Sequence, residues 1–396
     1  MKILIANVGS TSFKFKLYDM STEMILAQGR IENIGSSDSR CRLTAGEKSI
    51  ESVRAFPRYE DAIAECIDFI TGAENGPLSD LSELGAVGFK TVHGKGMSEC
   101  RLLDRHTLEA MEEYNFLAPA HNPPYIRAIK IFAEMVSVPL VALFEPAFHR
   151  TIPEYAYTYG IPRDLAQKHS IRKYGFHGAS HRYISERAPV FAGLNPERVR
   201  LISCHLGGSS SICAIKNGIS VDTSMGFSPQ SGVLNGKRCG DLDPFIPLYL
   251  QKAENLTVDE VAGILNSRSG LLGISDVSGD AKEIADAAVG GNEHAQLAVE
   301  SFCYGIKQYI GSYFVTLEGC DLLVFTGGIG EKSPLFREKI TLGLECLGIH
   351  LDRAKNRSVD GEAIISTDNS DIAVAVVPTN EELVVAREIK KLLQCT

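Results

Sequence analysis

The 396-residue sequence contains no stretch that approaches the roughly 20 consecutive apolar residues needed to cross a membrane. It does not open like a signal peptide, because Lys2 is the only early charge and the apolar run that follows stops at Ala6. It also has no Lys/Arg-rich run, and its formal net charge is −9. These absences argue against a membrane or a nucleic-acid partner.

The cysteine pattern excludes two further classes of protein. Ten cysteines are scattered along the chain without a C-x-x-C pair or a Cys/His cluster at metal-binding spacing. We therefore expect no metal centre built from cysteine and no disulfide framework, but reduced and mostly buried thiols in a cytoplasmic protein. No low-complexity segment or linker stands out either.

The composition is that of a folded protein with more than one core. Hydrophobic residues make up 44% of the sequence and charged residues 22%, which is typical of globular proteins. A chain of 396 residues is too long for a single compact core, so two domains are expected.

A short pattern, strand–Gly/Ser turn–strand, occurs twice. The first copy joins Ile3–Ala6 to Phe13–Tyr18 through residues 7–12, and the second joins Leu201–Cys204 to Ile212–Lys216 through residues 205–211. Such turns suit phosphate, because glycine allows close approach and backbone N–H groups point at the anion. One copy alone is better explained as an ordinary hairpin. Two copies predict a duplicated fold in which two phosphate-binding hairpins face each other.

The remaining pattern alternates strands with helices and predicts an α/β protein. Residues 24–56 should add antiparallel strands to the first hairpin, and a later strand, Val138–Phe144, delivers Glu145 at its C-terminal end, where open sheets bind ligands. A third glycine-rich segment, Gly327–Glu331, follows the strand Leu322–Thr326 as a nucleotide loop would. Thr379 and Glu382 form a capping-box pattern that should start the terminal helix.

Taken together in order, these segments resemble acetate kinase and the related short-chain carboxylate kinases of the actin-like ATPase and sugar kinase superfamily. The similarity extends from Ile3 to Glu388. The motifs that carry it are Asn7-x-Gly9-Ser10-x-Ser12-x-Lys14, His121-Asn122-Pro123, Ala147-Phe148-His149, Gly175-Phe176-His177-Gly178, His205-Leu206-Gly207, Val221-Asp222-Thr223-Ser224-Met225-Gly226, Arg238-x-Gly240-Asp241, Ser269-Gly270-Leu271-Leu272-Gly273, Phe325-Thr326-Gly327-Gly328-Ile329-Gly330-Glu331 and Pro378-Thr379-Asn380-Glu381-Glu382-Leu383.

The resemblance implies a reversible, ATP-dependent phosphorylation of a short carboxylate, acetate by default, with Mg²⁺ and with ATP/ADP as co-substrate. The implied catalytic residues are Glu145, His177 and Arg238, and the implied metal ligands are Asn7 and Glu381. Transfer between an anion and a polyanion depends mainly on positioning and charge neutralisation, which these residue types supply. Without the resemblance, a glutamate at the start of a helix only complements the helix dipole.

Two larger sets of residues follow from the same resemblance. The residues implied at the nucleotide are Ser10, Ser12, Lys14, His205, Leu206, Gly207, Gly208, Ser209, Asp280, Ala281, Lys282, Gly328, Ile329, Gly330, Glu331 and Lys332. Those implied around the carboxylate substrate are Lys90, Val92, Ala120, Phe176 and Pro229. For Lys14, strand alternation alone would already predict a solvent-facing side chain.

The sequence departs from the family pattern at several of these positions. Lys90 replaces an arginine and loses its bidentate fork, and Glu145 replaces an aspartate; the two substitutions are hypothesised to compensate for each other. Gly208 replaces the asparagine of the phosphate loop and Ser209 the glycine after it. Ala120 stands where the family has leucine, which predicts a larger pocket for the acyl chain. Three further substitutions are Ala179 for threonine, Lys332 for asparagine and Lys282 for arginine.

The resemblance also sets expectations for organisation. Residues 1–147 with 383–396 should form one domain and residues 148–382 the other, with the active site in a cleft that closes around the nucleotide. A homodimer formed through the second domain is implied. Two alternatives stay open: a kinase for propionate, butyrate or another small acid, and a nucleotide-binding protein of this fold without transfer activity.

Overall fold

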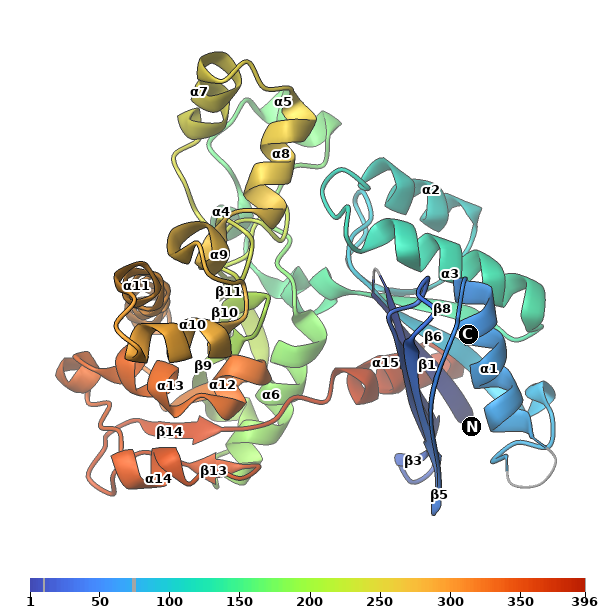
Figure 1. Ribbon diagram of the computed structural model, residues 1–396. Coiled ribbons are helices and arrows are strands. Elements are labelled where there is room, and N and C mark those ends of the chain that lie inside the picture. Colours follow the sequence, from blue (N-terminus) through green and yellow to red (C-terminus); the bar gives the residue numbers. More distant parts are fainter. Residues whose placement is uncertain (10, 73–75, 396) are drawn as a thin grey trace. The chain divides into compact units, whose positions relative to one another are not determined.

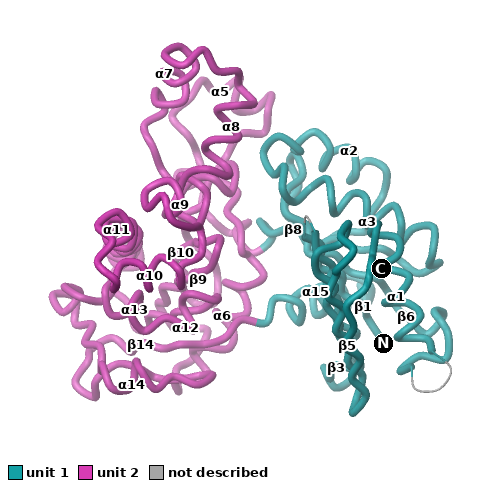
Figure 2. The backbone as a smooth tube through the Cα atoms, viewed as in Figure 1, with its two compact units in different colours: residues 1–147, 380–396 teal, residues 148–379 magenta. Residues whose placement is uncertain are grey.

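The computed structural model describes residues 1–9, 11–72 and 76–395. The chain divides into two compact units, Met1–Ala147 with Asn380–Thr396, and Phe148–Thr379 (Figure 2). Each unit is built on one mixed sheet with helices, as Figure 1 shows. The expected α/β class is confirmed.

The first unit contains an eight-stranded sheet in the order β5-β4-β3-β2-β1-β6-β8-β7. Strands β1 to β5 pair antiparallel in sequence, whereas β1, β6 and β8 pair in parallel. The antiparallel strands expected between residues 24 and 56 are therefore present. The bounds are β1 Lys2–Val8, β2 Ser12–Asp19, β3 Met24–Glu32, β4 Ser39–Ala45, β5 Lys48–Arg54, β6 Leu84–Thr91, β7 Cys100–Leu102 and β8 Leu140–Phe144.

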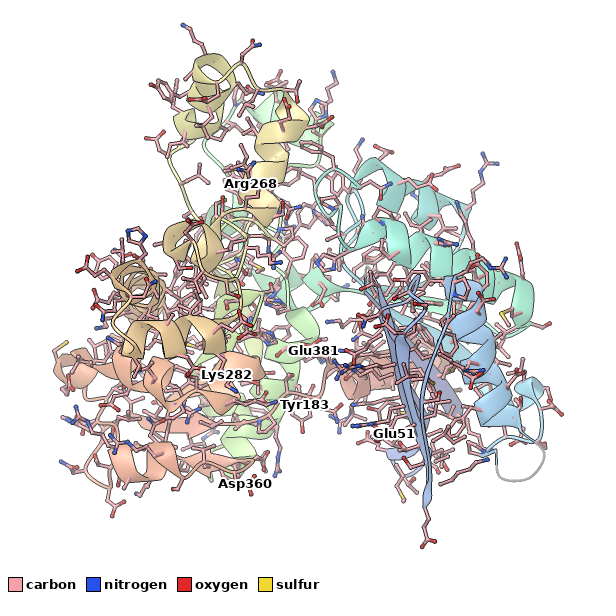
Figure 3. All side chains as sticks on the ribbon, viewed as in Figure 1. Glu51, Tyr183, Arg268, Lys282, Asp360 and Glu381 are labelled. Atoms are coloured by element: carbon pink, nitrogen blue, oxygen red, sulfur yellow. The ribbon has the colours of Figure 1, made fainter. Side chains whose placement is uncertain are left out.

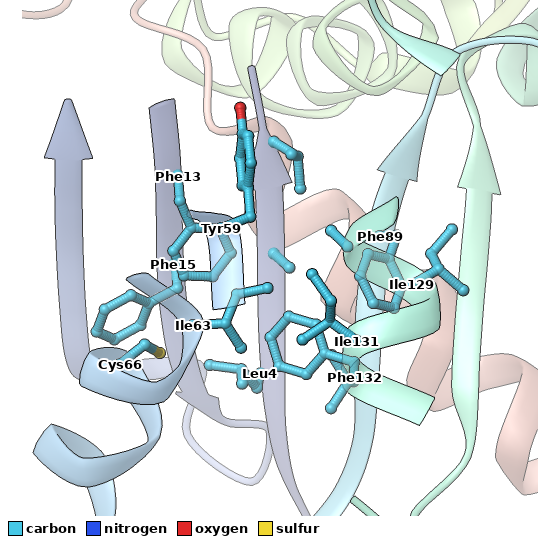
Figure 4. Packing of buried hydrophobic residues seen from close by; sticks show 14 of the residues in the cluster. Leu4, Phe13, Phe15, Tyr59, Ile63, Cys66, Phe89, Ile129, Ile131 and Phe132 are labelled. Atoms are coloured by element: carbon cyan, nitrogen blue, oxygen red, sulfur yellow. The ribbon is translucent and has the colours of Figure 1, made fainter. Parts of the chain in front are cut away.

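Helices cover both faces of this sheet. The helices are α1 Tyr59–Thr71, α2 Arg105–Glu113, α3 Asn122–Met135 and α15 Glu381–Cys395, with the 3₁₀ segments η1 Leu81–Glu83 and η2 Glu145–Thr151. Helix α15 lies against Gly88, on the face opposite to α1 and α3. Figure 4 shows Phe13 and Phe15 of β2 packed with Ile63 of α1 and Phe132 of α3. The lysines that alternate with these aromatic residues consequently point to the opposite face of β2.

The second unit repeats the strand order of the first around a six-stranded sheet, β11-β10-β9-β12-β14-β13. Its hairpin β9–β10 is antiparallel, and β9, β12 and β14 pair in parallel, just as β1, β6 and β8 do. The predicted duplication of the hairpin is thus a duplication of six strands, since β13 pairs antiparallel with β14 as β7 does with β8. The bounds are β9 Arg200–Leu206, β10 Ser210–Lys216, β11 Ile219–Thr223, β12 Leu322–Thr326, β13 Ala363–Ile364 and β14 Ala373–Val376.

The expected core helix near residues 294–317 is α11, Glu293–Thr316, whose buried face includes Phe302, Ile306 and Ile310. The other helical segments of this unit are α4 Glu154–Tyr157, α5 Arg163–Lys168, α6 Gly178–Phe191, η3 Pro196–Arg198, α7 Phe245–Ala253, α8 Val258–Ser267, α9 Gly270–Ser275, α10 Ala281–Val289, α12 Gly327–Lys332, α13 Pro334–Thr341, η4 Leu344–Leu347 and α14 Arg353–Arg357.

The predicted capping box at the terminal helix is wrong. The helix α15 begins at Glu381, and the buried Thr379 Oγ1 makes no hydrogen bond among the described residues. The Glu382 carboxylate instead accepts hydrogen bonds from Asn7 Nδ2 (3.4 Å) and Lys16 Nζ (3.4 Å). The Glu382 carboxylate therefore binds the ammonium of Lys16 and the amide N–H of Asn7, both distant in sequence. Within the described chain it does not bind the backbone N–H at the start of the helix, as the capping-box pattern predicts.

Two further features of the described residues bear on the sequence expectations. No described helix has the length and apolar character that a membrane span requires. All ten cysteines lie in the described residues as free thiols; the buried ones are Cys41, Cys66, Cys204, Cys213, Cys303 and Cys320.

Candidate active site

The turn of the first hairpin is fixed by two hydrogen bonds of the Gly9 backbone. Gly9 N donates to Ser12 O at 2.8 Å, and the Tyr59 hydroxyl at the start of α1 donates to Gly9 O. A side chain on Gly9 would meet Ser12 Oγ at 2.5 Å, so the Ser12 side chain would have to move to admit one. Ser10, predicted at the phosphates, lies outside the described residues. Ser12 begins β2 and is partly exposed.

Three charged side chains meet at the ends of β6, β8 and the start of α15. Lys90 Nζ lies 2.9 Å from Glu145 Oε1 and also forms an ion pair with Glu381 Oε2. Lys90 belongs to β6, Glu145 follows β8, and Glu381 begins α15, where Figure 3 labels it. The hypothesised pairing of Lys90 with Glu145 is thus seen as an ion pair, and Glu381 joins it.

The cluster is shielded from solvent and carries an excess negative charge. The side chains of Lys90, Glu145 and Glu381 are 15%, 4% and 14% exposed. Burial alone would lower the pKa of Lys90, but the two carboxylates outweigh it and raise that pKa well above its ordinary value. Lys90 is therefore a fixed cation, and two carboxylates against one ammonium leave room for further positive charge.

The predicted metal ligand Asn7 lies at the end of β1 in the same unit. Asn7 Oδ1 accepts a hydrogen bond from the Tyr125 hydroxyl at 3.2 Å, and its Nδ2 donates to Glu382. Burial raises the pKa of Tyr125 far above the neutral range, so its hydroxyl remains a donor. The described residues contain no group of three His, Cys, Asp or Glu side chains placed to hold a metal ion.

Lys14 extends from the exposed side of β2, directly opposite Asn7 in the register of the hairpin. It lines a pocket of about 270 Å³ whose other charged residues are Lys16, Arg30, Arg42 and Glu382. Four cations around one carboxylate make this part of the sheet electropositive. The geometry fits the predicted phosphate contact of Lys14 and also the solvent-facing position that alternation predicts.

The substrate residues predicted in the first unit differ in exposure. Val92 is buried, whereas Ala120 is exposed in the turn before α3. Asn122 at the start of α3 fixes this region, because its buried Nδ2 donates to His93 O and Met111 O, both at 2.9 Å. The His-Asn-Pro motif therefore joins the loop after β6 to the turn that contains Ala120.

In the second unit, His177 stands immediately before α6 in the left-handed region, with φ 56° and ψ 27°. Such a backbone conformation is uncommon for a residue other than glycine and often marks a functional site. Its ring stacks on that of His205 with centroids 4.2 Å apart, and its Nδ1 lies 2.7 Å from Ser211 Oγ. Gly175 precedes it at φ +76°, where a side chain would meet Thr223 and His149.

The second hairpin turn contains Leu206, Gly207, Gly208 and Ser209. Leu206 is buried, and Gly207 N donates to Ser210 Oγ at 3.2 Å. Gly208 O accepts from Gly236 N at 3.0 Å, which ties this turn to the loop that carries Arg238. A side chain on Gly207 would come within 3.9 Å of Gly328 N, so the turn also lies beside the third glycine-rich segment.

Arg238 is held against this turn by two side chains. Arg238 Nη2 donates to Ser209 Oγ and lies 3.4 Å from Asn235 Oδ1. Asn235 is buried and accepts in turn from Ser210 N at 2.6 Å. Gly270, at φ +64°, allows the loop to approach, because any side chain there would collide with Asn235 O and Arg238 O. Burial lowers the pKa of Arg238 to about 10, which leaves it charged at neutral pH.

The third glycine-rich segment is a short helix, α12, which continues directly from β12. Gly327 N donates to Glu331 Oε1 at 2.9 Å. Behind it, the buried Arg337 donates from Nη1 to Gly330 O (2.7 Å) and Glu331 O (2.9 Å). The same guanidinium donates to Asn356 Oδ1 and O, both at 2.7 Å.

The remaining predicted residues of the second unit are placed as follows. Asp280 caps α10 by accepting from Lys282 N (2.8 Å) and Glu283 N (3.2 Å), and Ala281 and Lys282 form its first turn (Figure 3). Phe176 and Pro229 are buried, and Ile329 and Gly330 are buried in α12, which also contains Gly328 and Lys332.

A duplicated α/β fold with hairpin turns, an arginine beside one turn and a glycine-rich segment at the end of a strand defines a phosphotransferase of the nucleotide-dependent kinase type. The model of the acetokinase family matches residues 2–387. The sequence is 44% identical over 396 residues to the acetate kinase of Clostridium novyi (strain NT), covering 100% of this chain and 99% of the relative. It is 43% identical over 397 residues to the acetate kinase of Methanosarcina thermophila, with coverage of 100% and 97%.

Solved structures agree with the sequence comparison. The fold matches acetate kinase from Porphyromonas gingivalis with a TM-score of 0.87 and 38% identity, covering 99% of both chains. It matches a propionate kinase from Francisella tularensis subsp. tularensis SCHU S4 with a TM-score of 0.89 and 37% identity, covering 98% of both chains. The chain belongs to the acetokinase family. It is a phosphotransferase with a carboxyl group as acceptor, and the family resemblance read from the sequence is confirmed.

Several residues that complete the site geometry were not predicted as site residues. They are Tyr125, Asn235, Ser211, His181, Glu382 and Arg337. Ser211 and Glu382 lie in segments that the sequence singled out, but the contacts that give all six their role form only in the folded chain. Asn235 lies three residues before Arg238, and this spacing within a motif is the one feature that could have indicated it.

Proposed function

We propose that this chain phosphorylates a short-chain carboxylate, acetate by default, with ATP, and that it catalyses the reverse transfer from the acyl phosphate to ADP. The observation that carries the proposal is Arg238, a cation held by Ser209 and Asn235 at the turn of the second hairpin, beside His177 and the glycine-rich α12. The relatives are acetate kinases over the full chain length.

In this proposal each residue has a role that suits its charge. Arg238 binds the carboxylate and the transferring phosphoryl group, and His177 donates to an oxygen of that group. Lys90 holds Glu145 next to the substrate, and Lys14 with the turns of both hairpins contacts the phosphates. The segments Asp280–Lys282 and Gly328–Lys332 frame the adenosine. The two compact units are the two domains, and each contains one of the two hairpins.

Mg²⁺ is part of the proposal, and Asn7 and Glu381 would hold it. Both present oxygen atoms, which Mg²⁺ prefers, and one or two protein ligands are usual where phosphates supply the rest. The excess negative charge of the Lys90–Glu145–Glu381 cluster accommodates a cation. When bound, the metal would neutralise phosphate charge.

The substrate preference is open to one alternative. The exposed Ala120 lacks the bulk of the family leucine, and a propionate kinase is among the similar structures. If Val92, Ala120, Phe176 and Pro229 surround the acyl chain, the pocket should accept propionate, and butyrate to a lesser degree.

The direct test is the formation of acyl phosphate, trapped as hydroxamate, from ATP and a panel of acetate, propionate and butyrate. We expect Mg²⁺-dependent product with at least one acid. Nucleotide binding by calorimetry without any product from the panel would favour the alternative of a nucleotide-binding protein that has lost transfer.

We also propose a homodimer formed through the second unit. The nine-residue helix α7 has no buried residue in the described chain, and four of its large apolar side chains are exposed. Phe245, Ile246, Leu248 and Tyr249 are 72%, 44%, 57% and 70% exposed. Exposed apolar groups of this kind mark interfaces. Sedimentation should show a dimer at micromolar concentration, and Tyr249→Glu should shift it to monomer. The free cysteines fit a reducing compartment, so we place the enzyme in the cytoplasm.

A further inference from the structure

A line of buried serine and histidine side chains lies behind His177 in the second unit. His181 Nδ1 is 2.9 Å from Ser203 Oγ, and His181 Nε2 is 2.8 Å from Ser211 Oγ. Ser211 Oγ is also 2.7 Å from Nδ1 of His177. Ser203, His181 and Ser211 have no exposed surface. The line therefore connects His177 to the interior of the sheet, out of reach of water.

The number of hydrogens in this line is fixed. Burial lowers the pKa of His181 well below its ordinary value, with smaller contributions from His149 and His205, so its ring is neutral and has one N–H. Each serine supplies one O–H. Ser211 therefore donates to one of its two histidines and accepts from the other.

Ser203 determines the direction of the line. Among the described residues its side chain makes a single hydrogen bond, to His181 Nδ1. If His181 donated to Ser203 through Nδ1–H, the Ser203 hydroxyl hydrogen would be buried without an acceptor, which is costly. If Ser203 donates to Nδ1, every hydrogen has an acceptor: His181 Nε2–H donates to Ser211, and Ser211 O–H donates to His177 Nδ1.

We infer that Ser203, His181 and Ser211 form a one-directional hydrogen-bond chain that holds neutral His177 in the tautomer with its proton on Nε2. These three are positioning residues, and the inference rests on the proposed function of His177 as a donor to the transferring phosphoryl group. The chain supplies what that role needs, because Nδ1 is occupied as an acceptor and the N–H donor of the neutral ring is therefore on Nε2. The donor is then available without protonating the ring.

A neighbouring pair provides a matched control. His149 Nε2 must donate to Phe176 O (3.0 Å), because a carbonyl only accepts, and Ser220 Oγ therefore donates to His149 Nδ1 (2.9 Å). Ser220 is as buried as Ser203 and Ser211, but its histidine is not hydrogen-bonded to His177. Ser220→Ala thus removes the same kind of hydroxyl from the same region without breaking the chain.

The test begins with the tautomers themselves. Long-range ¹H–¹⁵N spectra of enzyme labelled at histidine, assigned with His177→Gln and His181→Gln, should show a bare Nδ1 and a protonated Nε2 in both rings of the wild type. A protonated Nδ1 in His181 would overturn the inference. In Ser211→Ala and in Ser203→Ala the His177 ring should populate both tautomers, whereas Ser220→Ala should leave its signals unchanged.

Kinetics provide the second readout. Ser211→Ala and Ser203→Ala should lower kcat by about 10- to 100-fold with little change in KM for ATP, a size typical of lost supporting contacts. Ser203→Ala is decisive, because Ser203 lies three hydrogen bonds away from His177. Equal kcat losses in Ser203→Ala and Ser220→Ala would mean that the chain is only structural. If the wild type formed no acyl phosphate, the proposed function would fail while the tautomer measurement would still stand.

Discussion

Lys90 Nζ lies 2.9 Å from Glu145 Oε1, and both residues depart from the family pattern at once. The ammonium also binds Glu381 Oε2, so a single lysine connects the ends of β6 and β8 to the start of α15. We hypothesise that the lysine with the longer acid takes the place of an arginine with an aspartate, so that the two departures are one change in two places.

Lys90→Met should unfold the first unit more easily. Removing the ammonium leaves two shielded carboxylates without their cation, and breaking such a buried pair costs about 3–5 kcal/mol. Denaturant titration of the free energy of unfolding measures the loss. Lys95→Met is the control, since Lys95 pairs with Glu113 at 2.6 Å on the surface and should cost about 1 kcal/mol or less.

Variants at Lys90 and Glu145 should distinguish a simple replacement of arginine by lysine from co-adaptation of the two residues. With Glu145 unchanged, Lys90→Arg should raise KM for the carboxylate, because the larger fork meets an acid that is already one methylene too long. The double variant Lys90→Arg with Glu145→Asp should recover at least part of the loss. A lower KM in Lys90→Arg alone would show that Lys90 is a weaker stand-in for arginine and that Glu145 is independent of it.

Arg238→Ala and His177→Ala should each lower kcat by on the order of 100- to 1,000-fold while nucleotide affinity changes little, because both direct charge at groups that matter most in the transition state. Single-turnover kinetics and calorimetric binding of ADP separate the two effects. Lys237→Ala, at the exposed neighbour of Arg238, controls for a general loss of charge in the loop. Near-normal turnover in either variant would refute the assigned role.

Arg337→Met should weaken nucleotide binding indirectly, through the segment that Arg337 supports. The guanidinium donates to the carbonyls of Gly330 and Glu331, and each buried carbonyl left without a donor costs about 1–3 kcal/mol. We expect a lower melting temperature and a KM for ATP raised about tenfold, with kcat less affected. Arg353→Met removes an exposed arginine that pairs with Glu338 at 2.9 Å, and should change neither quantity much.

Stability should fall on acidification because of His149. Burial lowers the pKa of His149 from 6.5 to about 4, so as the pH falls the unfolded chain takes up this proton before the folded chain does. The stability from neutral His149 is present above about pH 6.5 and is lost toward pH 4, by at most about 3 kcal/mol. Denaturant titrations at several pH values should show this slope reduced in His149→Gln and retained in His294→Gln, which alters an exposed residue.

Acyl-chain preference should follow Ala120. A pocket discriminates by about 1–3 kcal/mol per methylene, so an enlarged pocket should accept propionate at least as well as acetate. Ala120→Leu should then shift kcat/KM toward acetate. The Tyr125 hydroxyl is already hydrogen-bonded to Asn7 Oδ1, which leaves Phe176 as the residue more able to fill the space. A tenfold native preference for acetate that Ala120→Leu does not change would rule the enlarged pocket out.

Much of this architecture follows from patterns that are local in sequence. Alternation of Phe13, Phe15 and Leu17 with two lysines fixed the faces of β2, and the paired glycine-rich turns indicated the duplicated hairpins. The compensation between Lys90 and Glu145 was suggested by two substitutions together. The family motifs then supplied the remaining site residues.

What the sequence could not show are contacts between distant residues. Glu381 lies 291 positions from Lys90, and nothing local indicates that they meet. The capping box failed for the same reason, since Glu382 has a stronger partner in Lys16 than in its own helix end. The sharing of Ser211 by two histidines depends on the register between β9 and β10 and on the position of α6.

The return of the chain to the first unit has a consequence for synthesis on the ribosome. Residues 1–147 emerge first, but α15, which packs Val385 and Ile389 against Gly88, is made last. Until then one face of β6 lacks its cover and Lys90 lacks Glu381. The first unit therefore stays incomplete while the second unit is translated. Helix α15 then covers β6 and brings Glu381 to Lys90.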